Sequence, residues 1–167
     1  MSPGPVLRRI GTVRTPYARR EDAPLQPVFD PETEGILEVD PEYADALDGL
    51  GEFSHIWLLT WLGPPDDAAP LPELRQVPLL LRETPRELGI FATRGPRRPN
   101  PIALSLVKLL SIDGCTLRFA GTDLLDGTVL LDVKPFVAMF DLPIDEIRNG
   151  WFDERLHDFD PRQGARP

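Results

Sequence analysis

Short stretches of alternating or continuous apolar residues recur along the chain and predict β-strands. In residues 115–121 (CTLRFAG), Leu117 and Phe119 point to one face and the intervening residues to the other. Residues 130–136 (LLDVKPF) alternate in the same way, whereas 53–62 (FSHIWLLTWL) form a mostly apolar, aromatic run, as is typical of a buried strand. Other strand candidates are residues 6–13, 35–39, 77–83 and the two apolar ends of the stretch 91–109. Six or more short strands and little helix predict a mainly-β fold, either a barrel or a sandwich.

Turns and loops separate these strands. The 20 prolines and 13 glycines favour many short elements over long helices. Residues 15–33 and 63–73 form polar, proline-rich loops, and 41–50 predict a short helix with Pro41 near its start. Asp126-Gly127 is a hairpin signal between the strands at 115–121 and 130–136.

The length of 167 residues suits a single domain, and the polar stretch 153–167 reads as a C-terminal tail that frays. Cys115 is the only cysteine, so no intrachain disulfide can form. The first residues lack an apolar signal segment, and no stretch is long and apolar enough to span a bilayer. These features predict a cytoplasmic protein without a membrane partner.

The net charge of −9 limits how the chain can bind nucleic acid. Proteins that bind mainly by neutralising phosphates are normally basic, so contact with RNA would need a local patch. Lys108 and Lys134 are the only lysines among 18 basic residues. Arginine suits bidentate contact with carboxylates and phosphates, although biased composition would produce the same excess.

The stretch FATRGPRRPNPIALSLVKL (91–109) places its arginines among prolines. Arg98 and Asn100 each precede a proline, so this segment should be extended and stiff, with the two side chains on one face. Two prolines without amide donors exclude an ordinary central strand. The segment is either a rigid surface loop with solvated arginines or a preorganised rim that holds an anionic group and the edge of a base.

Three further polar positions allow more than one interpretation. His55 lies in an apolar run and is either a core residue with its hydrogen bonds satisfied or a group that donates to a ligand or accepts a proton. Asp126 either completes a turn or binds a polar ligand edge. His157 has only aspartates near it in a polar tail, so we expect no metal site.

Taken in order, six blocks resemble the TsaA-like family, whose best understood members are the TrmO tRNA methyltransferases. The blocks are IGTVRTPY, LQP, FSHIWLL, FATRGPRRPNPIALS, TDLLDGTVLLDVKPF and the GW at 150–151. The resemblance implies a compact TsaA-like β-barrel over residues 1–152, unlike Rossmann methyltransferases, that forms a homodimer and binds S-adenosyl-L-methionine (SAM). It implies methylation of N6 in tRNA that carries threonylcarbamoyladenosine beside the anticodon. It also implies a short form that lacks the C-terminal domain of longer members.

Site residues follow from the same resemblance. The implied cofactor contacts are Pro24, Leu25, Gln26, His55, Ile56, Arg94, Leu104, Leu124, Leu125, Asp126 and Gly127. Arg94 can pair with the cofactor carboxylate, and Gln26 can read polar edges. His55 and Asp126 are the alternatives for the group that accepts the proton of the nucleophilic nitrogen. Arg97, Arg98 and Asn100 are the expected substrate contacts, either arginine being able to hold the threonylcarbamoyl carboxylate.

Two other functions remain open at this point. One is a SAM-dependent methyltransferase of a small molecule, and the other is a SAM-binding protein without enzymatic activity. The negative charge favours them, as do the departures from the family pattern, which include Leu25 in place of a frequent arginine and Phe136 in place of a tyrosine.

Overall fold

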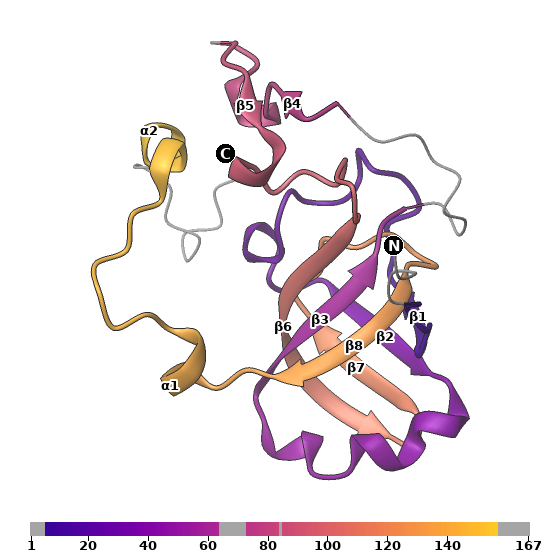
Figure 1. Cartoon of the computed structure of the whole chain (residues 1–167). Coiled ribbons are helices and arrows are strands. Elements are labelled where there is room, and N and C mark those ends of the chain that lie inside the picture. Colours follow the sequence, from indigo (N-terminus) through magenta and orange to yellow (C-terminus); the bar gives the residue numbers. More distant parts are fainter. Residues whose placement is uncertain (1–5, 64–72, 84, 157–167) are drawn as a thin grey trace.

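Six antiparallel strands close into a barrel in the computed structural model, which describes residues 6–63, 73–83 and 85–156. The strands are β1 (Gly11–Arg14), β2 (Glu34–Val39), β3 (His55–Trp61), β6 (Ile102–Asp113), β7 (Thr116–Ala120) and β8 (Val129–Pro135). Their order around the barrel is β1-β2-β7-β6-β3-β8, and β8 pairs with β1 to close it (Figure 1). The mainly-β prediction is confirmed, and the structure selects the barrel over the sandwich.

Strand alternation fills the inside of the barrel. On β3 the side chains of Ile56, Leu58 and Thr60 are buried, while the residues between them are partly exposed. On β7 the predicted apolar face, Leu117 and Phe119, is completely buried. These side chains belong to one hydrophobic cluster that runs through the barrel, with the exception of Thr60.

The predicted hairpin at Asp126-Gly127 is wrong. β7 pairs with β2 and β6, whereas β8 pairs with β3 and β1, so the strands on either side of this turn are not neighbours. The tight hairpin lies instead between β6 and β7, where Asp113 pairs with Thr116 and Gly114 has φ +55°. Residues 121–128 therefore cross from one side of the barrel to the other. On the way the amide of Asp126 donates to the carbonyl of Tyr17, and the amide of Gly127 donates to the carbonyl of Val13 on β1.

Short helical turns and two small strands complete the chain. They are η1 (Pro27–Phe29), η2 (Pro41–Leu47), η3 (Leu50–Glu52), β4 (Arg75–Gln76), η4 (Leu79–Leu81), β5 (Leu88–Gly89), η5 (Ile90–Ala92), α1 (Ala138–Asp141), η6 (Gly150–Phe152) and α2 (Asp153–Leu156). The predicted helix at 41–50 is present as the 3-10 helices η2 and η3. No helix in the described part of the chain is long and apolar enough to cross a membrane.

Three strand predictions differ from the structure. The expected strand 77–83 contains the 3-10 helix η4, since Pro78 gives no amide donor and the leucines do not alternate. The apolar lead at residue 91 is the 3-10 helix η5, preceded only by the two-residue strand β5. The strand expected over 6–13 is limited to β1 (Gly11–Arg14), because residues 11–14 are the ones that pair with β2.

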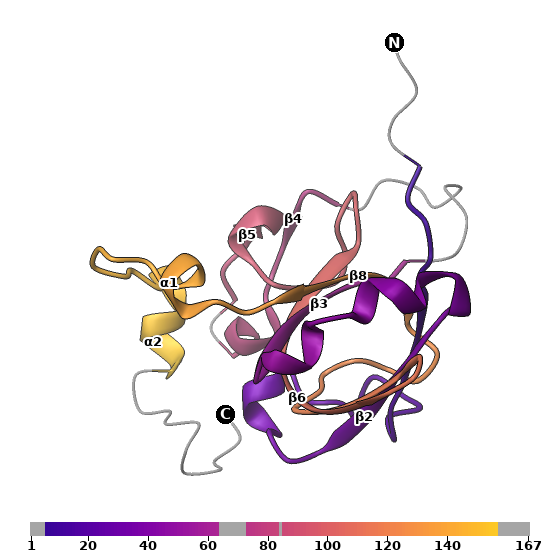
Figure 2. The same ribbon diagram turned by 90° about the horizontal axis from the view of Figure 1, so that it is seen from below.

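After β8 the chain leaves the barrel and forms an arm, residues 136–156. Figures 1 and 2 show α1 and α2 to one side of the barrel. The arm returns to the body through Trp151, which is 9% exposed and whose Nε1 donates to the carbonyl oxygen of Ala92 at 2.8 Å. The expected tail begins with the single turn α2, and His157 and the rest of that tail lie outside the described residues.

Candidate functional site

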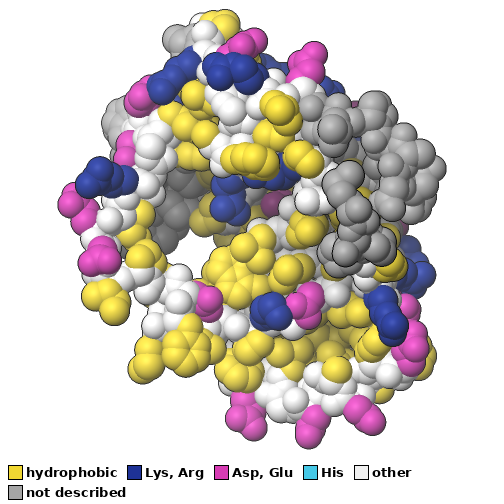
Figure 3. Space-filling model, in the orientation of Figure 1, with side chains coloured by type: hydrophobic (Ala, Val, Ile, Leu, Met, Phe, Trp, Pro, Cys, Tyr) yellow, Lys and Arg dark blue, Asp and Glu magenta, His cyan; other side chains and the backbone are white. Residues whose placement is uncertain are grey.

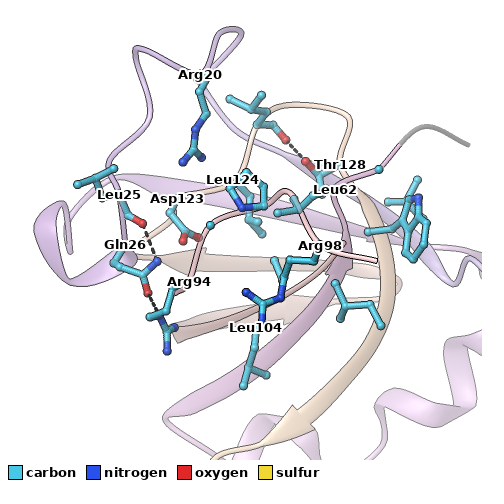
Figure 4. A pocket seen from close by; sticks show the side chains of 18 of the residues that line it. Arg20, Leu25, Gln26, Leu62, Arg94, Arg98, Leu104, Asp123, Leu124 and Thr128 are labelled. Carbon is cyan, nitrogen blue, oxygen red and sulfur yellow. Dashed lines mark hydrogen bonds between the residues drawn. The ribbon is translucent and has the colours of Figure 1, made fainter. Parts of the chain in front are cut away.

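A cavity of about 790 Å³ opens at the end of the barrel where β3 ends and β6 begins. Ligand pockets typically measure about 300–1,000 Å³. Three loops line it together with the ends of these strands, and they contribute residues 20, 25–26, 93–96, 98 and 123–128 (Figure 4). Figure 3 shows basic side chains inside the hollow between the barrel and the segment that carries β4 and β5. The molecule thus has a ligand-sized cavity with positive charge at its wall.

The crossing loop 121–128 forms one wall of the cavity and is tightly anchored. Thr15 donates through Oγ1 to the carbonyl of Leu124 at 2.8 Å and through its amide to Oδ1 of Asp126 at 3.2 Å. The amide of Asp126 donates to the carbonyl of Tyr17 at 2.9 Å, and Leu124 packs into the barrel core with 2% exposure. The wall is therefore fixed by the chain that leaves β1.

Arg94 faces Gln26 across the cavity entrance (Figure 4). Nε of Arg94 donates to Oε1 of Gln26 at 2.7 Å, and the side-chain Nε2 of Gln26 donates to the backbone carbonyl of Leu25 at 2.6 Å. This chain of hydrogen bonds orients the guanidinium through Nε. Its two terminal nitrogens then keep the fork geometry that binds a carboxylate.

Arg98 ties together the loop that carries Arg94. Its Nη1 donates to the carbonyls of Ile90 at 3.0 Å and of Thr93 at 2.8 Å, and its guanidinium lies 5.6 Å from the centre of the Phe91 ring. The guanidinium also lines the cavity. Arg98 thus has a structural contact set of its own, and its predicted role as a substrate contact stays a prediction.

Replacing Arg98 with alanine is expected to destabilise the protein by about 1–3 kcal/mol, since two carbonyls lose a charged donor. Urea unfolding would measure this, and hydrogen exchange should accelerate over residues 90–98. Arg97→Ala is the matched control, because Arg97 is exposed and its stability effect should stay within about 0.5 kcal/mol. Equal stabilities of the two variants would contradict the structural role.

Asp123 is a cavity residue that the sequence did not single out. Its Oδ1 accepts a hydrogen bond of 2.7 Å from Oγ of Ser105, which is 1% exposed. Burial raises the pKa of the Asp123 carboxyl, while the Ser105 hydrogen bond and the charges of Arg94 and Arg20 partly oppose this. The sequence feature that could have identified Asp123 is its position in TDLLDGT, directly before the implied cofactor contacts 124–127.

Asp126 lies at the rim and already has structural partners. Its Oδ1 accepts the amide of Thr15, and its Oδ2 lies 3.8 Å from Nη1 of Arg14. The side chain is 46% exposed. The turn interpretation of this residue is therefore supported by its contacts, whether or not a ligand also meets it.

His55 and Ile56 lie at the opposite end of the barrel from the cavity. His55 begins β3 and Trp61 ends it, and six steps of about 3.3 Å separate them by roughly 20 Å. Nδ1 of His55 is 2.9 Å from Oγ of Ser54, and its ring meets Phe136 edge-on. Ile56 is completely buried in the core.

The structure thus divides the predicted site residues into two groups. Those that line the cavity are Leu25, Gln26, Arg94, Arg98, Leu104, Leu124, Leu125, Asp126 and Gly127. Those that do not line it within one chain are Pro24, His55, Ile56, Arg97 and Asn100. The sequence placed Arg98 and Asn100 on one face of an extended segment, but only Arg98 of the two lines the cavity.

Comparison with known proteins agrees with this architecture. Residues 12–142 match the family model described as tRNA-methyltransferase O N-terminal domain. A probable S-adenosyl-L-methionine-binding protein of Pyrococcus abyssi is 39% identical over 150 residues, which are 90% of this chain and 77% of that protein. A tRNA (adenine(37)-N6)-methyltransferase of Escherichia coli is 37% identical over 137 residues, which cover 78% of this chain and 57% of the relative.

A solved structure supports the same relationship. The crystal structure of TrmO from Pseudomonas aeruginosa superposes with a TM-score of 0.68 at 34% identity, and the match covers 89% of this chain and 62% of that one. The chain therefore spans less than two thirds of the length of this solved relative. The family match over most of the chain, the barrel and these relatives lead to one conclusion: the protein belongs to the family of the tRNA-methyltransferase O N-terminal domain.

Proposed function

We propose that this protein is a SAM-dependent methyltransferase that methylates N6 of threonylcarbamoyladenosine beside the anticodon of tRNA. The observation that carries the proposal is the cavity at the barrel end, where eight of the cofactor contacts implied by the family resemblance come together. Relatives named S-adenosyl-L-methionine-binding proteins and tRNA (adenine(37)-N6)-methyltransferases support the cofactor and the reaction.

The cavity residues fit the chemical groups of SAM. The oriented guanidinium of Arg94 suits its carboxylate, and Gln26 offers a polar edge. Leu25, Leu104 and Leu125 offer apolar surface to its base. When bound, SAM supplies a methyl group on a positively charged sulfur. The protein's part is to hold the two reactants in line, and good alignment can contribute about 7–11 kcal/mol.

A local patch of arginines supports an RNA substrate despite the negative net charge. Arg20, Arg94 and Arg98 line the cavity, and Arg97 is exposed on the same loop. We assign the substrate's threonylcarbamoyl carboxylate to Arg97 in preference to Arg98, because Arg98 already donates to two backbone carbonyls. Asn100 stays a proposed substrate contact next to it.

We also propose that the protein acts as a cytoplasmic homodimer. The arm exposes apolar side chains, namely Met139 (83% exposed), Phe140 (79%), Leu142 (58%), Ile144 (100%) and Ile147 (60%). Yellow side chains of the arm face the hollow in Figure 3. A second copy would bury such surface, and it could bring His55 and Ile56 of one copy to the cavity of the other. This arrangement would explain why the cofactor contacts implied by the family lie at both ends of the barrel within one chain.

The test is methylation of tRNA by the purified protein, followed by nucleoside mass spectrometry. Transfer RNA that carries threonylcarbamoyladenosine should gain one methyl group on that nucleoside, and tRNA without the modification should not. In the source organism, deletion of the gene should remove the methylated nucleoside and raise the unmethylated one. If tRNA gains no methyl group but a metabolite extract does, the small-molecule methyltransferase, which the charge of −9 favours, is correct.

A further inference from the structure

We propose that Asp123 is the proton acceptor of the methyl-transfer step, an inference that rests on the proposed function. The resemblance to the family left this role open between His55 and Asp126. Within one chain His55 lies outside the cavity and can reach it only from a second copy, whereas Asp123 lines the cavity of its own chain. The carboxylate of Asp126 holds Thr15 and faces Arg14 at the rim. Asp123 is the other carboxylate among the described residues that line the cavity.

The position of Asp123 suits contact with a reacting group. Figure 4 shows it between Arg20 and the pair formed by Gln26 and Arg94. Ser105, on the inward face of β6, fixes one carboxylate oxygen through its hydroxyl. The hydrogen bond uses Oδ1, so Oδ2 is the oxygen that can accept a proton.

Among the described residues, the buried polar side chains of the barrel strands and of the crossing loop lie near this carboxylate. Most buried side chains in the barrel are aliphatic or aromatic, but Thr60, Ser105 and Thr122 are at most 1% exposed and lie at the cavity end. The hydroxyl of Ser105 binds Asp123, and that of Thr122 accepts the amide of Leu124. A buried hydroxyl costs stability unless it is hydrogen-bonded, and Ser105 and Thr122 meet this requirement through their contacts with the Asp123 loop. Oγ1 of Thr60 has no hydrogen-bond partner among the described residues.

The electrostatic environment makes Asp123 a better base than an exposed aspartate. Burial raises the pKa of its carboxyl, which strengthens its affinity for a proton. Arg94 and Arg20 act in the opposite direction and favour the ionised form that a base requires. A catalytic base is most effective when its pKa approaches the working pH, and the raised pKa moves Asp123 towards that condition.

The step balances with Asp123 in this role. As the substrate nitrogen forms its bond to the methyl carbon, the carbon–sulfur bond breaks and its electron pair stays on sulfur. The proton that the nitrogen loses passes to the Asp123 carboxylate. Release of that proton to solvent restores the carboxylate for the next cycle.

Asp123→Asn tests the role directly, because it keeps the shape of the side chain and removes the base. We expect kcat on modified tRNA to fall by about 10²–10⁴, the usual contribution of a general base, while the Kd for SAM measured by calorimetry changes little. Asp113→Asn at the far end of the barrel is the matched control and should keep wild-type activity.

Each outcome decides between distinct conclusions. Unchanged kcat in Asp123→Asn with an active wild-type protein would overturn the inference and leave the proposed function intact. A weakened Kd with unchanged kcat would also overturn it and would assign Asp123 to the cationic end of SAM. A wild-type protein that methylates no tRNA would overturn the proposed function and this inference together.

Ser105→Ala provides a second test with a readout that does not depend on turnover. Loss of a hydrogen bond that lowers the pKa of Asp123 should move its titration, followed by carbon NMR of the carboxyl in the free protein, to higher pH. The acid limb of the pH–kcat profile should move the same way, because the rate rises as the carboxylate forms. Ser111→Ala, an exposed serine on the same strand, should move neither. A titration that moves while the pH–kcat profile stays in place would refute Asp123 as the base.

Discussion

Replacing Phe119 with alanine is expected to lower the free energy of unfolding by about 3–5 kcal/mol, the usual cost of removing a buried aromatic ring. Phe119 is completely buried at the centre of the barrel cluster. Its ring fills the space over Gly35, its partner on β2, where an added Cβ would lie 2.4 Å from Cζ of the ring. A truncated side chain would leave a cavity between two strands that the backbone pairing holds apart.

Urea unfolding followed by tryptophan fluorescence would measure this loss. The matched control is Phe91→Ala, where the same ring is 78% exposed and the loss should be about 1 kcal/mol or less, the size of its contact with Arg98. Equal destabilisation by the two substitutions would show that the barrel interior does not dominate the stability. Since whole domains are stable by only about 5–15 kcal/mol, the loss at Phe119 should be plain in any unfolding curve.

Arg94→Ala should weaken SAM binding about 10- to 100-fold while leaving the fold intact. The oriented guanidinium is the group in the cavity that best matches a carboxylate, and a hydrogen bond to a charged group contributes about 1.5–3 kcal/mol. Arg94 is exposed, so its removal leaves no buried group unpaired apart from the partly buried Gln26. Calorimetric titration with SAM measures the affinity, and circular dichroism confirms the fold.

Arg97→Ala is the matched control for the cofactor assignment. It removes the same charge from the same loop at a position outside the cavity lining, so SAM affinity should stay at the wild-type value. If both variants bind SAM as the wild type does, the cofactor does not use Arg94. If both weaken it equally, the effect is long-range attraction by positive charge, and raising the salt concentration should remove it.

The arm is connected to the loop that carries Arg94 and Arg98. Trp151 connects it to Ala92, next to the loop that carries Arg94 and Arg98. The indole donates to the carbonyl of Ala92, and the carbonyl of the next residue, Thr93, accepts a hydrogen bond from Arg98. The arm and the arginine loop are thus coupled through a short run of backbone, and a partner that bound the arm would act close to the cavity.

The sequence by itself determined the barrel strands, and nine of the fourteen site residues that its family resemblance implied line the cavity. Alternation placed Leu117 and Phe119 inside because successive side chains of a strand point to opposite faces. The block FATRGPRRPNPIALS was chosen from its residues and TDLLDGT from the family resemblance, and parts of both line the cavity. Such local patterns are readable because steric preferences of neighbouring residues produce them.

Only the tertiary structure decided which strands pair and which polar groups meet. The Asp-Gly signal at 126–127 suggested a hairpin, but closure of the barrel separates β7 from β8, and the tight turn is Gly114-Cys115 between β6 and β7. His55 and Ser105 show the same limit. The length of β3 separates His55 from the cavity, and the barrel brings Ser105 on β6 to Asp123 on the crossing loop. Pairing and burial depend on segments far apart in the chain, and no local pattern of residues records how those segments close on one another.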